Sequence, residues 1–218
     1  MMIVMPNKKP AAKAKAPQTR ATQARKEVTH ERIVDVASRV IRRSGYDGTG
    51  VADIMKEAGL THGGFYAHFD SREALLAEAA DRARAEALVW TAQVFDGAPE
   101  GQGLQALTQA YLSDEHVNGV ERGCAVSALG SEMHRQAPEV RHVATRHIQQ
   151  LIDVVASQIA KDSAKDGAAG DDRAEYDEAM VRISAMVGTV VLARAVDDPA
   201  LATSLREAAL KYFLPAGD

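Results

Sequence analysis

Two short helical patterns separated by a glycine constrain this chain more than any other feature. Residues 50–57 and residues 61–68 each place apolar side chains at helical spacing, and the sequence Ala58-Gly59-Leu60 joins them. Two short helices joined by a turn of three or four residues that contains glycine form a helix-turn-helix. We therefore expect the second helix to lie at the surface, supported from below by the first.

The second of these helices carries an unusual pair of glycines. Gly63 and Gly64 lie side by side in its first turn, and each glycine costs about 1 kcal/mol relative to alanine in a helix interior. Helical spacing turns both phenylalanines of the segment inward. The expected outer face consists of His62, Gly63, Gly64, Tyr66 and Ala67. Because the glycines have no side chains, they would let the helix backbone come close to a partner, and in helix-turn-helix proteins that partner is the major groove of DNA.

The rest of the chain shows helical periodicity and no alternating strand pattern, which predicts an all-α fold. Before the motif, a helix is expected to begin after Thr29 as its N-cap and to end at Gly45. Near the end of the chain, Asp198 is a suitable cap, with Pro199 at the first helical position. The remaining helices are expected at about 71–92, 104–112, 124–136, 140–160, 173–196 and 199–212. A joint between two domains is expected within the helix over 71–92.

The distribution of charge supports a division of the chain. Residues 1–80 carry 13 Lys or Arg and 9 Asp or Glu, whereas residues 81–218 carry 13 and 21. The basic excess is densest over residues 1–27, where Ala, Pro and Gln fill the spaces between charges. Such a run does not pack a core, so we expect a disordered basic arm over 1–27, which is either a solubilising tail or a segment attracted to a polyanion. A helix-turn-helix domain over 28–80 and a helical domain over 81–218 would follow.

Cysteine content and hydropathy indicate where the protein works. The single cysteine excludes an intramolecular disulfide, which fits a reducing compartment. The opening apolar residues are too few for a signal-peptide core, and no later apolar run approaches the roughly 20 residues of a membrane span. We expect a cytoplasmic protein without a membrane partner.

The segment from about Thr29 to Ala79 resembles the DNA-binding domain of TetR-family transcriptional repressors. The stretch "GVADIMKEAGLTHGGFYAHFDSREALLAEA" follows that family's second, third and fourth helices, and "AGLTHGGFYAHF" and "SREALL" are its most specific pieces. Two positions depart from the family pattern: Met55 replaces the usual alanine at the helix crossing, and Gly64 replaces a small polar residue. The resemblance implies a homodimeric repressor that binds a palindromic DNA operator and is released by a small-molecule effector.

The resemblance also implies roles for individual residues of the motif. Thr49 and Thr61 would cap helices and touch phosphates, Gly63 and Gly64 would allow close approach, Tyr66 and His68 would hydrogen-bond to the DNA backbone, Arg72 would pair with a phosphate, and His62 would contact a base edge. With both glycines bare, His62 is nearly the only side chain able to read a base. Specificity by direct contact is therefore expected to be modest, with DNA shape contributing more.

The second domain matches the family only in layout, which implies ligand binding and dimerisation over residues 81–218. An apolar pocket with few polar groups is typical of effector sites. The candidate lining residues are Trp90, Phe95, Tyr111, Cys124, Met133 and His134. The helix over 173–196 is apolar on more than one face, and Gly188 would permit a close helix crossing at a dimer interface. A dimer would hold two recognition helices about 34–36 Å apart to read successive turns of one groove face.

Cys124 supports two alternative functions. It lies near a predicted helix start beside Arg122 and Gly123, conditions that lower the pKa of a thiol, and some members of the resembled family sense oxidants or electrophiles through cysteines. A DNA-binding redox or electrophile sensor is therefore one alternative, and a small buried apolar residue is the simpler interpretation. An enzyme that pairs Cys124 with His134 or His142 is the other.

Catalytic and metal signatures are missing from the sequence. It shows no Ser- or Cys-dependent catalytic signature, no phosphate loop and no metal-ligand spacing. His62 and His68, six residues apart on a short helix, would point in different directions and so would not hold a metal. The sequence predicts a protein that is not an enzyme and needs no metal or other cofactor.

Overall fold

The computed structural model describes residues 17–165 and 171–214. Every regular element in these ranges is a helix, which confirms the predicted all-α class. The elements are α1 (Pro17–Ser44), α2 (Val51–Glu57), η1 (His62–Ala67), α3 (Arg72–Gly97), α4 (Gly103–Tyr111), α5 (Asp114–Asn118), η2 (Val120–Arg122), α6 (Ala125–Leu129), η3 (Met133–Arg135), α7 (Pro138–Lys165), α8 (Asp172–Ala195) and α9 (Pro199–Phe213), where η marks a 3₁₀ helix. No helix in these ranges has the length and apolar character needed to cross a bilayer.

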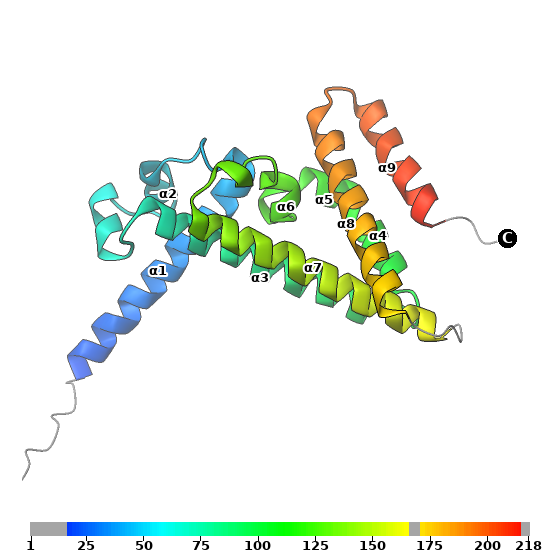
Figure 1. The fold of residues 1–218 in the computed structure, drawn as a ribbon. Coiled ribbons are helices and arrows are strands. Elements are labelled where there is room, and N and C mark those ends of the chain that lie inside the picture. The colour runs from blue at the N-terminus through cyan, green and yellow to red at the C-terminus, as the bar shows by residue number, and fades with distance from the viewer. Residues whose placement is uncertain (1–16, 166–170, 215–218) are drawn as a thin grey trace, which may run out of the picture.

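Two long helices join the ends of the molecule. Figure 1 shows α3 and α7 side by side between the helix-turn-helix at one end and the α8–α9 hairpin at the other. Because α3 starts soon after η1 and ends within the second domain, it belongs to both domains.

The helix-turn-helix domain has one apolar core. The C-terminal half of α1 packs on α3, and α2 and η1 close the core from the side. Phe65 and Phe69 are 2% and 3% exposed, which confirms their inward direction, and their rings stack with centroids 5.6 Å apart. The main core side chains are Ile33, Ala37, Val40, Ile41, Tyr46, Ile54, Met55, Phe65, Phe69, Leu75 and Leu76. This packing fixes the inner face of η1 and leaves its outer face to the surface.

The first helix begins earlier than the sequence suggested. It starts at Pro17, and the hydroxyl of Thr29 donates to the carbonyl of Arg25 at 2.9 Å from inside the helix, so Thr29 is not an N-cap. The disordered arm expected over 1–27 is therefore wrong from Pro17 onward, and residues 1–16 lie outside the described ranges. Proline at a helix start, followed by good helix formers and no glycine, accounts for the extension. The side chains from Arg20 to Val28 are all exposed.

The second domain is more interrupted than predicted. The helix expected over 124–136 is divided into α6 and η3, since α6 ends at Leu129 and Gly130 follows. The segment after α4, for which no helix was expected, forms α5 and η2. The predicted cap at Asp198 is confirmed, because its carboxylate accepts from the backbone N–H groups of Ala200 and Leu201 at 2.8 and 3.3 Å.

The core of the second domain lies in two clusters that meet at Trp90. One cluster includes Tyr111, Cys124 and Met186, and the other includes Leu107 and Ile159. The clusters are built by α3, α4, α7 and α8. Trp90, on α3, therefore lies between two halves of one helical core.

Candidate nucleic-acid interface and internal cavity

The second helix of the motif is tighter and shorter than predicted. It is the 3₁₀ helix η1 rather than an α-helix that continues through His68, and the Gly64 N–H donates to the Thr61 carbonyl at 3.0 Å. Thr61 occupies the N-cap position without a capping bond from its side chain, so the predicted capping role of Thr61 is wrong. The Thr61 side chain is exposed and remains a candidate phosphate contact.

The outer face of η1 carries two aromatic side chains. His62 is exposed, and Tyr66 is 73% exposed. Their rings lie edge to face with centroids 6.5 Å apart, and Tyr66 also packs edge-on against Phe65 at 5.2 Å. His62 and Tyr66 are therefore adjacent on the surface that a helix-turn-helix turns toward DNA.

The glycine pair is not required by the fold. A Cβ added to Gly63 would meet nothing within 4 Å, and one added to Gly64 would meet only Met55 Cε at 3.7 Å and Thr61 Oγ1 at 3.9 Å. Neither glycine has a positive φ, unlike Gly59 in the turn between the helices, whose φ is 69°. The two departures from the family pattern, Met55 and Gly64, thus lie next to each other, with the larger Met55 side chain beneath the glycine.

Thr49 and Arg72 have structural roles that the sequence did not predict. Thr49 is 3% exposed, its hydroxyl donates to the Gly45 carbonyl at 2.6 Å, and Gly50 is the N-cap of α2. The capping role of Thr49 is therefore wrong, and its burial removes it from the candidate DNA surface. The Arg72 guanidinium donates to the carbonyls of Tyr46 and, at 3.2 Å, Thr49. Arg72 thus ties the start of α3 to the turn before α2, and its pairing with a phosphate stays a prediction.

His68 directly follows η1 and lies beside His30 of α1. It is half-buried, and its Nδ1 is buried without a hydrogen-bond partner among the described residues. Burial lowers the pKa of His68, and the nearby charges of His30 and Lys26 lower it further. His68 is thus neutral at pH 7 and can donate one hydrogen bond. Lys26 lies on the exposed extension of α1, about one turn before His30, whose ring centroid is 6.1 Å from that of His68.

A cavity that is partly open to solvent lies in the second domain. Its volume is about 450 Å³, and α3, α4, α5 and the segment that follows α5 form its walls. The lining residues are Ala87, Trp90, Thr91, Ala110, Tyr111, Ser113, Glu115, His116, Gly119, Arg122, Gly123, Cys124 and Leu151. Trp90, Tyr111 and Cys124 are therefore brought together, as expected of a binding site.

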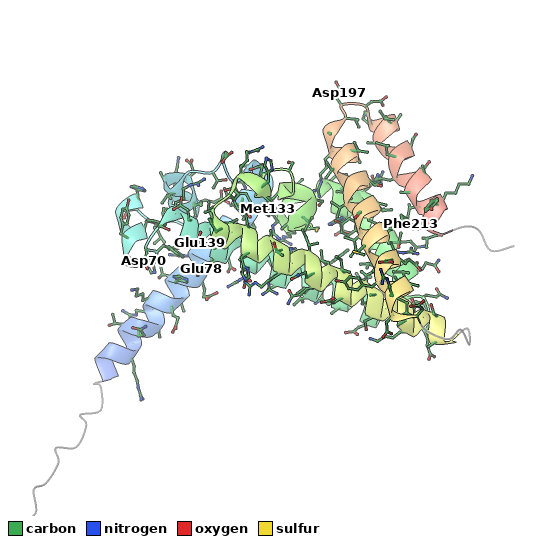
Figure 2. All side chains as sticks on the ribbon, viewed as in Figure 1. Asp70, Glu78, Met133, Glu139, Asp197 and Phe213 are labelled. Atoms are coloured by element: carbon green, nitrogen blue, oxygen red, sulfur yellow. The ribbon has the colours of Figure 1, made fainter. Side chains whose placement is uncertain are left out.

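The other three predicted lining residues lie elsewhere. Phe95 packs in the core cluster of Leu107 and Ile159. Met133 packs against the core of the helix-turn-helix domain, and Figure 2 shows it over the junction between the domains, far from Phe213 at the opposite end. His134, beside it on η3, is exposed. Met133 and His134 lie away from the cavity because the division of α6 from η3 places the residues after Gly130 against the first domain, and Phe95 does so because it is taken up by a core cluster.

His116 is the cavity residue that the sequence analysis missed. Its Nε2 accepts from the Cys124 N–H at 3.1 Å, so its Nδ1 carries the proton and donates to the Tyr111 carbonyl at 2.6 Å. The ring stacks on Trp90, with centroids 5.5 Å apart and planes 13° apart. Burial lowers the pKa of His116, in accord with a neutral ring. Its position in a segment expected to have no helix gave no signal of this role.

Arg194 and the Tyr111 hydroxyl complete the far side of this region. Arg194, on α8, donates to the carbonyls of Val117 and His116 at 2.8 and 2.9 Å and to Ser127 Oγ at 3.2 Å. The Tyr111 hydroxyl is buried beside Cys124 and Ser127, and burial raises its pKa well above the ordinary value. The region beside Cys124 is therefore mainly apolar on its inner side, and it opens to solvent past the exposed residues Glu115, Gly119 and Arg122.

Two family models match the chain. The model of bacterial regulatory proteins of the tetR family matches residues 33–79, and the model of the tetracyclin repressor-like C-terminal domain matches residues 101–209. The chain belongs to the TetR family of transcriptional regulators. Both matched segments fall within the two domains described above.

Curated relatives of this TetR-family regulator are distant. The HTH-type transcriptional regulator LmrA of Bacillus subtilis (strain 168) is 30% identical over 117 residues, which cover 50% of this chain and 62% of LmrA. The uncharacterized regulator YfiR of the same organism is 28% identical over 133 residues, covering 56% of this chain and 62% of YfiR. The chain thus spans less than two thirds of the length of these two relatives.

Solved structures share the fold over most of the chain. A TetR-family regulator from Chloroflexus aurantiacus J-10-FL superposes with a TM-score of 0.73 at 24% identity, covering 88% of this chain and 97% of that one. A regulator from Agrobacterium tumefaciens gives 0.71 at 21%, covering 86% and 98%. Escherichia coli NemR in its reduced form gives 0.71 at 18%, covering 85% and 95%. At these identities the likeness establishes the fold alone.

The structure does not bring Cys124 together with His134 or His142, the pairs considered for an enzyme. His134 and His142 are exposed, whereas Cys124 is 5% exposed and buried in the second domain. The imidazole that contacts the Cys124 backbone is that of His116, and both of its nitrogens take part in backbone hydrogen bonds. In the part of the chain that the structure describes, no three His, Cys, Asp or Glu side chains gather as a metal site would require.

Proposed function

We propose that this TetR-family regulator is a homodimeric repressor that binds a palindromic DNA operator through η1. The observation that carries the proposal is the open space around Gly63 and Gly64 beside the exposed His62 and Tyr66. Two adjacent glycines weaken a helix, and no contact of the described fold requires them. Close approach of DNA gives them a reason, because a base edge or phosphate could then come near the backbone of η1.

The proposal assigns the contacts as follows. His62 reads a base edge, Tyr66 and His68 donate to the DNA backbone, and Thr61 touches a phosphate. Since Gly64 supplies no side chain, direct readout rests mainly on His62, and the remaining specificity comes from DNA shape and deformability. An operator with one sharply preferred base at each position along η1 would contradict this assignment.

Exposed apolar stripes on α8 and α9 support dimerisation. On α8, Val181 and Leu192 are 63% and 53% exposed, and Gly188 lies on the same face with nothing within 4 Å of an added Cβ. On α9, Leu201 and Tyr212 are 46% and 77% exposed, and their separation places them on one face. Apolar side chains exposed at helical spacing on two adjacent helices favour packing against a second copy. The paired copy would bring its own helix-turn-helix to the neighbouring half-site.

The cavity is the proposed effector site. It is large enough for a small organic molecule, and its aromatic and aliphatic walls suit an apolar one. A ligand shifts the equilibrium between two states only by the difference between its affinities for them. An effector that releases the operator must therefore bind the DNA-incompetent form more tightly.

A mobility-shift assay on operator fragments selected from genomic DNA tests the DNA-binding face. The double change His62→Ala and Tyr66→Ala is expected to weaken binding by at least tenfold, since a lost base contact costs about 1–3 kcal/mol. A matched control, His142→Ala with Tyr176→Ala, removes one exposed histidine and one exposed tyrosine from α7 and α8. Equal affinities of the two double variants would refute the assignment of η1 as the reading element.

Thiol chemistry at Cys124 is an alternative trigger for the same DNA-binding protein. Its side chain lines the cavity, so a reactive small molecule that enters would meet the sulfur. Its burial, at 5% exposed, works against direct attack from solvent. If Cys124→Ser leaves release of the operator by hydrogen peroxide intact, this alternative fails.

A further inference from the structure

One segment belongs both to the cavity and to the contact between domains. Residues Gly119–Cys124, here called the wall segment, contain η2 and contribute Gly119, Arg122, Gly123 and Cys124 to the cavity lining. The same segment packs against α1, near its C-terminal end. The part of the cavity wall that this segment forms is therefore in direct contact with α1 of the DNA-binding domain.

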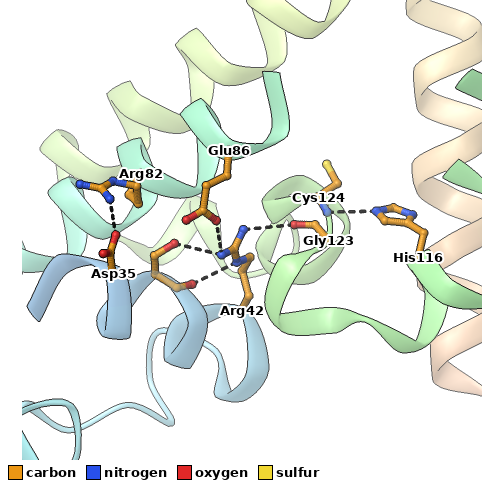
Figure 3. A network of polar contacts seen from close by, with 8 residues as sticks. Asp35, Arg42, Arg82, Glu86, His116, Gly123 and Cys124 are labelled. Carbon is orange, nitrogen blue, oxygen red and sulfur yellow. Dashed lines mark hydrogen bonds and ion pairs between the residues drawn. The ribbon is translucent and has the colours of Figure 1, made fainter. Parts of the chain in front are cut away.

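Arg42 holds the wall segment from a buried position. It is 2% exposed, and its Nη1 donates to the Gly123 carbonyl at 3.4 Å. Its other groups are anchored within the first domain and on α3: Nε donates to the Ser38 carbonyl at 3.1 Å, and Nη2 pairs with Glu86 Oε2 at 2.6 Å. Figure 3 shows the guanidinium between Glu86 and Gly123. The bond to Gly123 is the longest of these contacts and therefore the weakest and the easiest to break.

Arg43 joins the wall segment to the helix that supports η1. Its Nη1 pairs with Glu121 Oε1 at 2.6 Å, and its Nη2 pairs with Glu57 Oε2 at 2.8 Å. Glu57 is the last residue of α2, and α2 packs directly on η1. All three side chains are substantially exposed, and such pairs contribute little to stability. The bridge is thus suited to linking two elements without being needed for folding.

The wall segment is tightly packed on the side that faces the cavity. The Cys124 N–H donates to His116 Nε2 at 3.1 Å, as Figure 3 also shows. A Cβ added to Gly123 would lie 3.1 Å from Arg194 Nη2, 3.2 Å from His116 Nε2 and 3.3 Å from the Gly119 carbonyl oxygen. Closely packed groups transmit displacement rather than absorb it. Pressure from the cavity on this segment must therefore move the Gly123 carbonyl or the residues of η2.

We propose that Arg42 and Arg43 are positioning residues that transmit occupancy of the cavity to the helix-turn-helix through the wall segment. An occupant that displaces the wall segment lengthens the Arg42–Gly123 bond and pulls on Arg43 through Glu121. Arg43 passes the change to Glu57 and α2, which carries η1 out of register with the groove. This inference rests on the proposed function, since it assumes that η1 binds the operator and that the cavity is the effector site.

A substituted side chain supplies a defined occupant for the test. Ala110 lines the cavity, and Ala110→Trp would place an indole inside it. Operator affinity is measured by mobility shift for the wild type, Ala110→Trp, Glu121→Gln and the double variant. Ala110→Trp is expected to weaken operator binding by about 5- to 150-fold, the usual range of allosteric coupling. Should circular dichroism show that the tryptophan prevents folding, Ala110→Phe takes its place.

The decisive quantity is the factor by which the cavity occupant weakens binding. In the Glu121→Gln background this factor is expected to fall at least threefold, while Glu121→Gln alone changes operator affinity by less than twofold. The control is Glu178→Gln, which removes the exposed carboxylate of another ion pair, Arg182–Glu178 at 2.8 Å, near the other end of α8 from Arg194. Glu178→Gln should leave the factor unchanged.

Two results would overturn the proposal. One is an unchanged factor in the Glu121→Gln background, because the occupant and the bridge would then act independently. The other is an Ala110→Trp protein that folds and binds the operator as tightly as the wild type. In both cases operator binding by the wild type would still support the proposed DNA-binding function. Failure of the wild type to bind selected DNA would overturn that function and this inference together.

Discussion

The DNA-binding domain contains two glycine-bearing segments that differ in what surrounds them. In the turn before α2, Gly45 has a φ of 75°, and a Cβ on Gly48 would lie 2.1 Å from the Ser44 carbonyl oxygen. In η1, a Cβ added to Gly63 would meet nothing within 4 Å. The same residue type is therefore demanded by the fold in the first segment and left free by it in the second. A binding partner that approaches the η1 backbone would account for the presence of glycine at positions 63 and 64.

The hydrogen bonds around the two segments follow the same division. The Tyr46 N–H in the turn donates to Glu132 at 2.8 Å, and Arg72 donates to the carbonyls of Tyr46 and Thr49. On the outer face of η1, the side chains make aromatic contacts, between His62 and Tyr66 and between Tyr66 and Phe65. Changes in the turn should therefore alter stability, whereas changes on the outer face of η1 should alter DNA binding.

The largest expected effect is that of Gly48→Ala. The added methyl would collide with the Ser44 backbone, and overpacking of this kind costs about 3 kcal/mol when the backbone must shift. Urea unfolding followed by circular dichroism measures the loss. Gly97→Ala serves as the control, because a Cβ there meets nothing within 4 Å. Equal stability of Gly48→Ala and the wild type would show that the turn is not constrained as described.

The effect of acid tests the expectation that buried residues alter stability rather than DNA binding, and His147 is such a residue. His147, on α7, is 2% exposed. Its pKa is lowered to about 4, chiefly by burial and also by the charges of Arg84 and Arg42, which outweigh the opposing charge of Asp81. Below pH 6.5 the unfolded chain binds a proton that the folded chain does not, so the free energy of unfolding falls between pH 6.5 and 4. The loss from this group is up to about 3 kcal/mol.

His147→Gln isolates that contribution from the other histidines. Its unfolding free energy, measured in urea at pH 7, 5.5 and 4.5, should fall less steeply with acid than that of the wild type. Parallel pH profiles for the two proteins would mean that His147 already binds its proton in the folded state.

A smaller effect, on DNA binding alone, is expected from Gly63→Ala. Alanine favours a helix more than glycine does, so the change should leave stability unchanged or raise it by about 0.5–1 kcal/mol. The methyl would stand between the backbone of η1 and the DNA, and we expect operator affinity to fall about tenfold, which corresponds to about 1.4 kcal/mol. Mobility shift and urea unfolding on the same preparation separate the two effects. Loss of stability without loss of affinity would reverse the comparison.

The helix-turn-helix could be predicted from the sequence because its signals are local. The spacing of apolar residues, Gly59 in the turn and the two inward phenylalanines together specify which face of η1 is exposed. The roles of Thr49 and Arg72 could not be predicted, because they depend on contacts with the Gly45–Gly50 turn that only the folded chain brings together. A threonine before a helix has the same local pattern whether its hydroxyl caps that helix or bonds backward.

The cavity was only partly predictable for the same reason. Aromatic residues on long helices, such as Trp90 and Tyr111, are expected near a core, and both line the cavity. His116 became a wall residue through the fold of α5 and η2, short helices whose stability comes from tertiary packing rather than from local sequence. The start of α1 was missed for a different reason. Its charged residues form no apolar face, and the sequence therefore predicted disorder, yet they are helical although their side chains are exposed.

That exposed start of α1 provides the last and smallest test. Arg25 and Lys26 lie about one turn before His30, whose ring centroid is 6.1 Å from that of His68, so these two basic residues are close to the end of η1. Each phosphate contact by Lys or Arg contributes about 0.9 to the slope of log affinity against log salt concentration. We therefore expect Arg25→Gln with Lys26→Gln to reduce that slope by up to about 1.8. Arg173→Gln with Lys211→Gln, which removes two exposed charges from the second domain, should leave the slope unchanged. If both pairs leave it unchanged, the extension of α1 is a solvated helix, and η1 with its immediate neighbours makes up the whole DNA-binding surface.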